Sequence, residues 1–208
     1  MITKLRDKSI DEVRADIAGF SLRYASDWER WMNTAAQERP SIFVQTLGRW
    51  KATRPGRLRR LRVLAGEHPP PYIEDLLASS VQPLQILGNL SVGAFVIPTQ
   101  AERDALTDLW TVFSGLRQVG TASCVAITKA VLLLSDGRIG PAFDSKVRDK
   151  LEIPRLLTAH DWITVICDIS DDIRAFEQRH NRRFCDAAPL QFQNLGYGRL
   201  YDMVFGPR

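Results

Sequence analysis

Apolar residues recur at helical spacing along most of the chain. Two runs follow a Ser/Thr-x-x-Glu pattern: Val13, Ile17 and Phe20 after Ser9-Ile-Asp-Glu12, and Leu106, Leu109, Trp110 and Phe113 after Thr99-Gln-Ala-Glu102. Intervals of three and four residues place such side chains on one face of an α-helix. The Ser/Thr-x-x-Glu spacing is that of a capping box, which satisfies free backbone amides at a helix start. We therefore predict helices after Ser9 and Thr99, and a third after the similar Ser26-Asp-Trp-Glu29.

Three longer segments also have helical patterns. Residues 72–87 follow three prolines at 69–71, and Pro83 is expected to bend the helix. Residues 122–134 are apolar almost all round, which predicts a central buried helix. Residues 162–178 predict a long helix, although Ile-Thr-Val-Ile-Cys at 163–167 also fits a strand. Strand-like alternation is otherwise scarce, so we predict a mostly α fold.

The chain has 208 residues, a length that suits one helical domain, residues 1–208. The two best break points are 54–71, rich in Arg, Gly and Pro, and 137–141, rich in Gly and Pro. We interpret both as functional loops that join helices rather than as domain linkers.

Composition excludes several classes of protein. Hydrophobic residues are 45% and charged residues 25%, which is typical of a globular protein. No apolar run approaches the ~18 residues of a membrane span, and the N-terminal segment lacks the apolar core of a signal peptide. Cys124, Cys167 and Cys185 are scattered without a Cys-x-x-Cys pair, which argues against a zinc or iron–sulfur site. We expect a cytoplasmic protein with no metal, no cofactor and no membrane partner.

Charge is concentrated in one segment. Arg49 to Arg62 contains seven basic residues and no acidic one, whereas the rest of the chain has 21 basic against 24 acidic residues. A patch of this kind attracts polyanions, of which nucleic acid is the commonest. The alternative is a solvated arginine-rich loop.

Residues 116–148 contain the most informative motif. Val119-Gly120 predicts a tight turn between a helix that ends near Leu116 and one that starts near Thr121. The backbone amides of Thr121, Ala122 and Ser123 would then point out of the N-terminus of a helix, where phosphate binds readily. After the apolar helix and a Gly/Pro-rich loop, Asp144-Ser145 opens another helix, in which Lys146 and Arg148 follow.

This stretch of about 33 residues resembles the helix–hairpin–helix (HhH-GPD-like) DNA glycosylase superfamily. The family hairpin reads Leu-Pro-Gly-Val-Gly, and Leu116-Arg-Gln-Val-Gly120 stands in its place. The family aspartate lies in a Val-Asp-Thr-His-Val-x-Arg-like segment, which resembles Phe143-Asp-Ser-Lys-Val-Arg148. Residues 127–134 and 141–145 look closer to an 8-oxoguanine-glycosylase-like bacterial branch, with a Ser-Lys-Leu-Leu-like helix before Pro-x-x-Asp-Ser.

The departures from the family concern the hairpin and a lysine. Arg117 and Gln118 replace the hairpin Pro and first Gly, and the segment from Gly120 to Asp144 is a few residues longer than usual. Ala122 stands where bifunctional members have a Schiff-base lysine. Lys129 is the nearest lysine on the same predicted helix, and the bacterial branch has one at a matching place. Lys129 is either a pocket residue and nucleophile or a lysine that is ion-paired or reaches solvent.

The resemblance implies two helical lobes that flank a cleft, and an enzyme that flips a base out of the duplex. In that reaction the Asp144 carboxylate would stabilise the positive charge that develops on the sugar and orient the attacking water. The alternative is structural, because Asp and Ser are preferred N-cap residues. The expected DNA contacts are Gly120, Thr121, Ala122, Ser123, Arg54, Arg57, Arg59, Arg60, Lys146 and Arg148, and Trp50 is expected to form the base pocket.

The leading hypothesis is a monofunctional DNA glycosylase that acts on double-stranded DNA without an obligatory protein partner. It would hydrolyse the N-glycosidic bond of a damaged base, or of a hypermodified base of phage DNA in anti-phage defence, and leave an abasic site. The alternatives are a bifunctional glycosylase/lyase that uses Lys129, a non-catalytic DNA-binding module, and a helical adaptor that docks an acidic protein.

Overall fold

The computed structural model describes residues 1–54, 56–64 and 66–207; Pro55 and Ala65 of the predicted loop 54–71 therefore lie outside the described residues. Across the described ranges the chain is mostly helical and has no strand. The α-helices are α1 (Ile10–Ala18), α2 (Leu22–Met32), α3 (Arg39–Arg49), α4 (Ile73–Leu87), α5 (Gln100–Ser114), α6 (Cys124–Leu134), α7 (Ser145–Leu151), α8 (Ala159–His180), α9 (Phe184–Ala187) and α10 (Tyr197–Phe205). Short 3₁₀ turns are η1 (Ala36–Glu38), η2 (Arg62–Leu64), η3 (Val92–Ala94) and η4 (Leu190–Phe192). The prediction of a mostly α fold is confirmed.

Two of the three predicted capping boxes are present. Ser9 caps α1 and Thr99 caps α5, each with its reciprocal glutamate. The third prediction is wrong, because α2 begins at Leu22, four residues before Ser26. Ser26 therefore lies inside the helix and does not cap it. There the Ser26 hydroxyl donates a hydrogen bond to the Arg23 carbonyl within the helix. A Ser-x-x-Glu pattern caps a helix only where the serine backbone has left the helical conformation.

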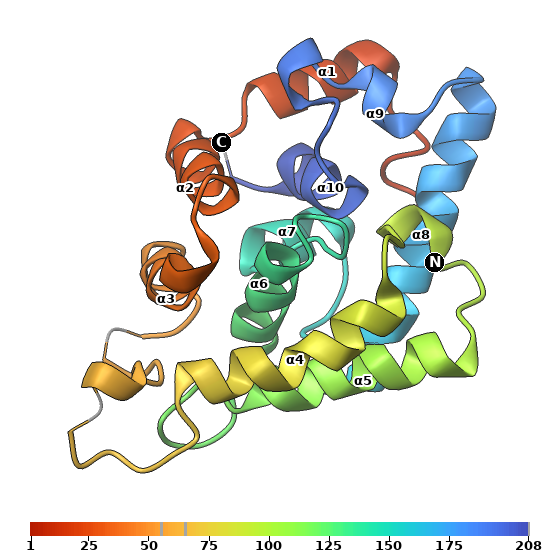
Figure 1. Ribbon diagram of the computed structural model, residues 1–208. Helices are drawn as coiled ribbons and strands as arrows, with labels where there is room; N and C mark the ends of the chain where they lie inside the picture. Colours follow the sequence, from red (N-terminus) through yellow and green to blue (C-terminus); the bar gives the residue numbers. More distant parts are fainter. Residues whose placement is uncertain (55, 65, 208) are drawn as a thin grey trace.

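The predicted central helix is α6, which lies in the middle of the molecule (Figure 1). All its residues from Ala126 to Leu133 are buried, and α3 and α5 pack against it. Helices α4 and α5 run side by side along one edge, and α1, α9 and α10 cover the opposite one (Figure 1). The helix predicted at residues 72–87 is α4, and Pro83 lies inside it.

Residues 163–167 belong to the single long helix α8, so the strand alternative for them is wrong. Buried positions continue through α8 at intervals of three and four residues, from Trp162 and Ile166 to Ile169, Ile173 and Phe176. A strand at 163–167 would interrupt this apolar face, which is buried from Trp162 to Phe176.

The Gly/Pro-rich loop 137–141 is a packing surface for α10. The Arg199 amide donates to the Gly137 carbonyl at 2.7 Å. A Cβ placed on Gly198 would lie 2.5 Å from the Gly140 nitrogen, so the two backbones touch directly. This contact fixes α10 against the connection between α6 and α7, immediately before Asp144.

None of the helices in the described ranges is both long and apolar enough to cross a membrane. The three cysteines are free thiols.

Candidate functional site

The arginine-rich segment is docked on the hairpin. The Arg59 amide donates to the Leu116 carbonyl at 2.8 Å, and the Gln118 amide donates to the Arg57 carbonyl at 3.0 Å. The Gln118 side chain adds a bond to the Leu58 carbonyl at 2.9 Å. Two segments that the sequence analysis singled out separately, about 60 residues apart, therefore form one surface.

A groove of about 1250 Å³ lies between this segment, the end of α3 and the start of α6. Its basic side chains are Lys51, Arg54, Arg57, Arg59, Arg60 and Arg117, and its aliphatic ones include Val44, Leu58, Leu61, Leu64 and Val125. No acidic side chain occurs among the described residues that line it. The lining of the groove therefore combines aliphatic side chains with strongly basic ones.

The arginines of the segment have different roles. Arg54, Arg57 and Arg60 are exposed, as phosphate-binding side chains must be. Arg59 is half-buried, and its guanidinium donates to the Gly115 carbonyl at 2.5 Å and to the Pro71 carbonyl at 3.0 Å. Arg59 therefore holds neighbouring loops together.

The hairpin differs from its prediction in detail. Gly120 has a φ of +71°, the left-handed conformation expected at this turn. Helix α6 starts at Cys124 rather than near Thr121, and the amide of the buried Ala122 donates to the Ser114 carbonyl at 2.8 Å. Ala122 therefore has no free amide for a phosphate, which corrects that prediction. Thr121 is exposed, and Ser123 is the N-cap residue of α6 and lines the groove.

Lys129 and Asp144 come together beside the core. Asp144 is the N-cap residue of α7, where Oδ1 accepts from the Val147 amide at 3.1 Å. Its other oxygen, Oδ2, lies 3.8 Å from Lys129 Nζ. Lys129 Nζ donates to the Trp50 carbonyl at 2.6 Å. The side chain of Lys129 is 7% exposed and that of Asp144 22%, so the carboxylate is the more accessible partner.

The electrostatics of this pair extend into α10. Burial lowers the pKa of Lys129, and the charges of Asp144 and Asp202 oppose that shift. Asp202 is itself buried, accepts from the Ala142 amide at 3.1 Å and pairs with Arg199 at 2.8 Å. Burial raises the pKa of Asp202, against the effect of Arg199. The sequence analysis missed Asp202 and Arg199, although an i, i+3 ion pair within the otherwise apolar segment 197–205 was a usable signal.

Trp50 does not offer a free ring face. It is 2% exposed, its ring is stacked on Trp28, and its indole nitrogen donates to Asp27 at 3.2 Å. The Arg199 guanidinium lies 5.6 Å from the ring centroid. The prediction that Trp50 stacks on a base is wrong for this conformation, because aromatic and cationic neighbours bury it. Its contribution to the site is the backbone carbonyl that accepts from Lys129.

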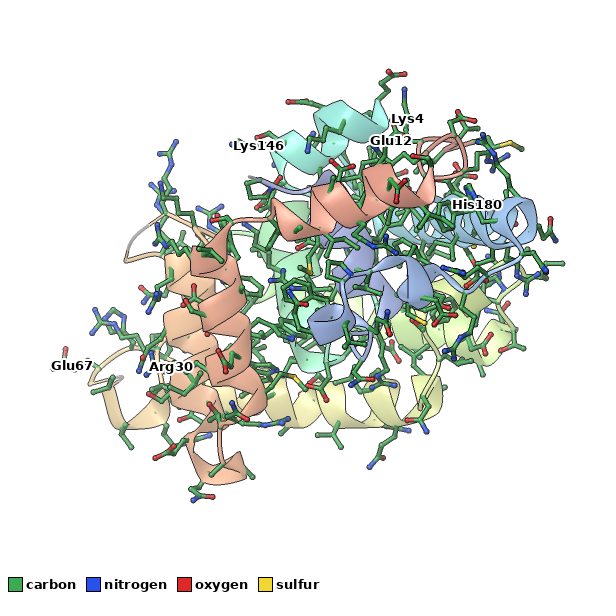
Figure 2. The ribbon with its side chains drawn as sticks, turned by 90° about the horizontal axis from the view of Figure 1, so that it is seen from above. Lys4, Glu12, Arg30, Glu67, Lys146 and His180 are labelled. Atoms are coloured by element: carbon green, nitrogen blue, oxygen red, sulfur yellow. The ribbon has the colours of Figure 1, made fainter. Side chains whose placement is uncertain are left out.

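Lys146 and Arg148 lie on α7, outside the lining of the groove. Lys146 is exposed and Arg148 is half-buried, and neither lines the groove. Figure 2 places Lys146 far from Glu67, which follows the arginine-rich segment. A nucleic acid that contacts both Lys146 and the groove must therefore extend over a large part of the protein surface.

Comparisons with protein families, curated proteins and solved structures find no match to this chain. In the described part of the chain, no cluster of three or more His, Cys, Asp or Glu side chains is arranged to hold a metal ion. Functional inference therefore rests on the groove and on the contact between Lys129 and Asp144.

Proposed function

We propose that this protein is a DNA glycosylase that hydrolyses the N-glycosidic bond of a damaged or modified base. The observation that carries the proposal is the contact between Asp144 and Lys129, in a chain that also has a basic groove. Val125 lines the groove, and Lys129 lies one helical turn further along α6. Lys51 also lines the groove and follows Trp50, whose carbonyl binds Lys129. Two residues of the groove are therefore close along the chain to Lys129 and to its hydrogen-bond partner.

The Asp144 carboxylate is suited to this chemistry. When the base departs with the bonding electron pair, positive charge develops on the deoxyribose, and a fixed carboxylate stabilises it. The Val147 amide holds Oδ1, while Oδ2 faces Lys129 and remains able to orient a water for attack at C1′. The helix cap and the ion pair thus give the carboxylate two partners that favour this orientation.

Two classes of base are candidate substrates. One is a damaged base of cellular DNA, and the other is a hypermodified base of phage DNA, removed in defence. A panel of oxidised, alkylated and deaminated oligonucleotides, together with phage DNA that has hypermodified bases, separates these two classes.

The decisive experiment measures base release by wild type and Asp144→Asn on this panel. Asparagine is also a good N-cap residue, so this change removes the charge and keeps the helix start. We expect release to fall about 100-fold or more, because a positioned general base or charge is lost. Asp149→Asn, an exposed position on the same helix, is the matched control and should release base at the wild-type rate.

Undiminished release by Asp144→Asn would show that Asp144 is not the catalytic carboxylate. DNA binding without release from any substrate would favour the non-catalytic module instead.

One observation favours a second candidate, a bifunctional glycosylase/lyase. Burial lowers the pKa of Lys129, and a neutral amine is a nucleophile. The amine would attack C1′ and displace the base, which leaves with the bonding electron pair. The sugar ring would then open as the C1′–O4′ bond breaks, with a proton passing from nitrogen to O4′, and the resulting imine is reduced by borohydride to a stable amine. A protein–DNA adduct trapped with wild type and lost in Lys129→Gln would support this mechanism, and the absence of an adduct on a cleaved substrate would exclude it.

A further inference from the structure

The groove has features that the phosphates of a duplex do not require. Phosphates need only the exposed cations of its lining, such as Arg57 and Arg60. The lining also presents aliphatic side chains, including Leu61, Leu64 and Val125. Leu64 is 64% exposed, which leaves apolar surface in water when the groove is empty. An occupant that satisfies both parts must be anionic along one edge and apolar along another.

The size of the groove indicates an extended occupant. Single small-molecule sites have volumes of roughly 300–1000 Å³. At about 1250 Å³, this groove exceeds that range and is open along its length between α3 and the start of α6. One of its lining residues, Val125, lies one helical turn before Lys129 on α6, and another, Lys51, follows Trp50. These two lining residues are therefore close along the chain to Lys129 and its partner.

We propose that the groove binds an unpaired strand of DNA beside the base that reacts, so that the preferred substrate is single-stranded or locally melted DNA. This inference rests on the proposed glycosylase function. In a duplex the base faces are stacked inside and cannot contact the aliphatic side chains of the lining, whereas unpaired bases can. The bases pack on aliphatic side chains and guanidinium planes, and the phosphates bind the exposed arginines.

The chain offers a matched pair of variants for the test. Leu64 and Val63 are adjacent in η2, and both are exposed, but only Leu64 lines the groove. Fluorescence anisotropy would follow a labelled oligodeoxynucleotide of about 15 nucleotides, with and without its complement, at one salt concentration. We expect tighter binding of the single strand than of the duplex. We expect Leu64→Ser to weaken single-strand binding by about tenfold, from lost apolar burial, and Val63→Ser to leave it unchanged.

Several outcomes would overturn the inference. The first is a duplex that binds as tightly as the single DNA strand, or more tightly. The second is wild-type affinity of Leu64→Ser for the single strand. The third is an RNA strand of the same sequence that binds more tightly than the DNA strand. Tighter binding of a labelled acidic, leucine-containing peptide would instead assign the groove to a protein partner.

The failures of the two proposals are distinguishable. Single-strand binding that depends on Leu64, without base release from any substrate, would remove the glycosylase and leave the groove assignment in place. Base release could instead depend on Asp144, with equal rates on single-stranded and duplex DNA and no effect of Leu64→Ser. That result would keep the glycosylase function and remove the groove assignment.

Discussion

The residue with the most unusual environment is Lys129. Its ammonium group has lost nearly all contact with water, at 5% residue exposure, on a helix whose other buried residues are uncharged. A buried cation is tolerated only with partners that replace its hydration. The Trp50 carbonyl at 2.6 Å and the Asp144 carboxylate at 3.8 Å serve as these partners. Burial lowers the pKa of Lys129, and the charges of Asp144 and Asp202 offset that shift only in part.

This environment predicts a pH dependence of stability. The pKa of Lys129 in the folded protein lies below its ordinary 10.5, so between these two values the unfolded chain binds more protons than the folded one. The free energy of unfolding therefore rises with pH over that range, as the cost of a buried charge disappears. In urea denaturation from neutral pH to about pH 10, wild type should gain stability relative to Lys129→Met.

Lys146→Met is the control, because the Lys146 side chain is exposed on α7. Its stability should run parallel to that of wild type across the same pH range. A parallel curve for Lys129→Met as well would refute the depressed pKa.

At the scale of elements, the position of Asp144 depends on how α10 is docked. The backbone of α10 approaches the 137–141 loop so closely that only glycine fits at Gly198. Asp202 on the same helix accepts from the Ala142 amide, two residues before Asp144. The loop, the start of α7 and α10 therefore form one rigid unit that orients the candidate catalytic carboxylate.

We predict that Gly198→Ala destabilises the protein by about 1–3 kcal/mol, because overpacking forces backbone shifts. The added Cβ would lie 2.5 Å from the Gly140 nitrogen and 2.8 Å from the Ile139 carbonyl carbon. Chemical denaturation measures the change. In Gly48→Ala, inside α3 with no atom within 4 Å of the new Cβ, we expect a gain of about 0.5–1 kcal/mol. Wild-type stability of Gly198→Ala would contradict the close packing.

At the scale of the whole molecule, the net charge of +4 conceals a division of charge. The seven basic residues of Arg49–Arg62 extend from the end of α3 through the following loop to η2, at a corner of the fold (Figure 1), while the remainder of the chain is mildly acidic. A polyanion is therefore attracted to one side of the molecule, the side on which the groove opens.

The salt dependence of DNA binding checks this division. Arg57→Gln/Arg60→Gln should reduce the slope of log affinity against log salt by about 1.5, from two lost phosphate contacts. Arg14→Gln/Arg182→Gln removes the same charge from exposed positions outside the groove and should leave the slope nearly unchanged. Equal slopes for both double variants would mean that DNA binds elsewhere or through net charge alone.

Local interactions made much of the fold predictable from the sequence. Capping by Ser9 and Thr99, and the left-handed turn at Gly120, depend on residues a few positions apart. Helical periodicity likewise revealed the buried character of α6, and the run of arginines revealed the basic segment.

Tertiary structure alone decided how these parts meet. Three features depend on residues that are distant in sequence. They are the burial of Trp50, the hydrogen bond from Arg59 to the Gly115 carbonyl, and the contact between Lys129 and Asp144. A sequence pattern states which side chains prefer the interior, whereas packing determines which of them touch. The candidate residues were therefore identifiable one by one from the sequence. Their arrangement into a groove and into the Lys129–Asp144 contact follows from the packing of the helices.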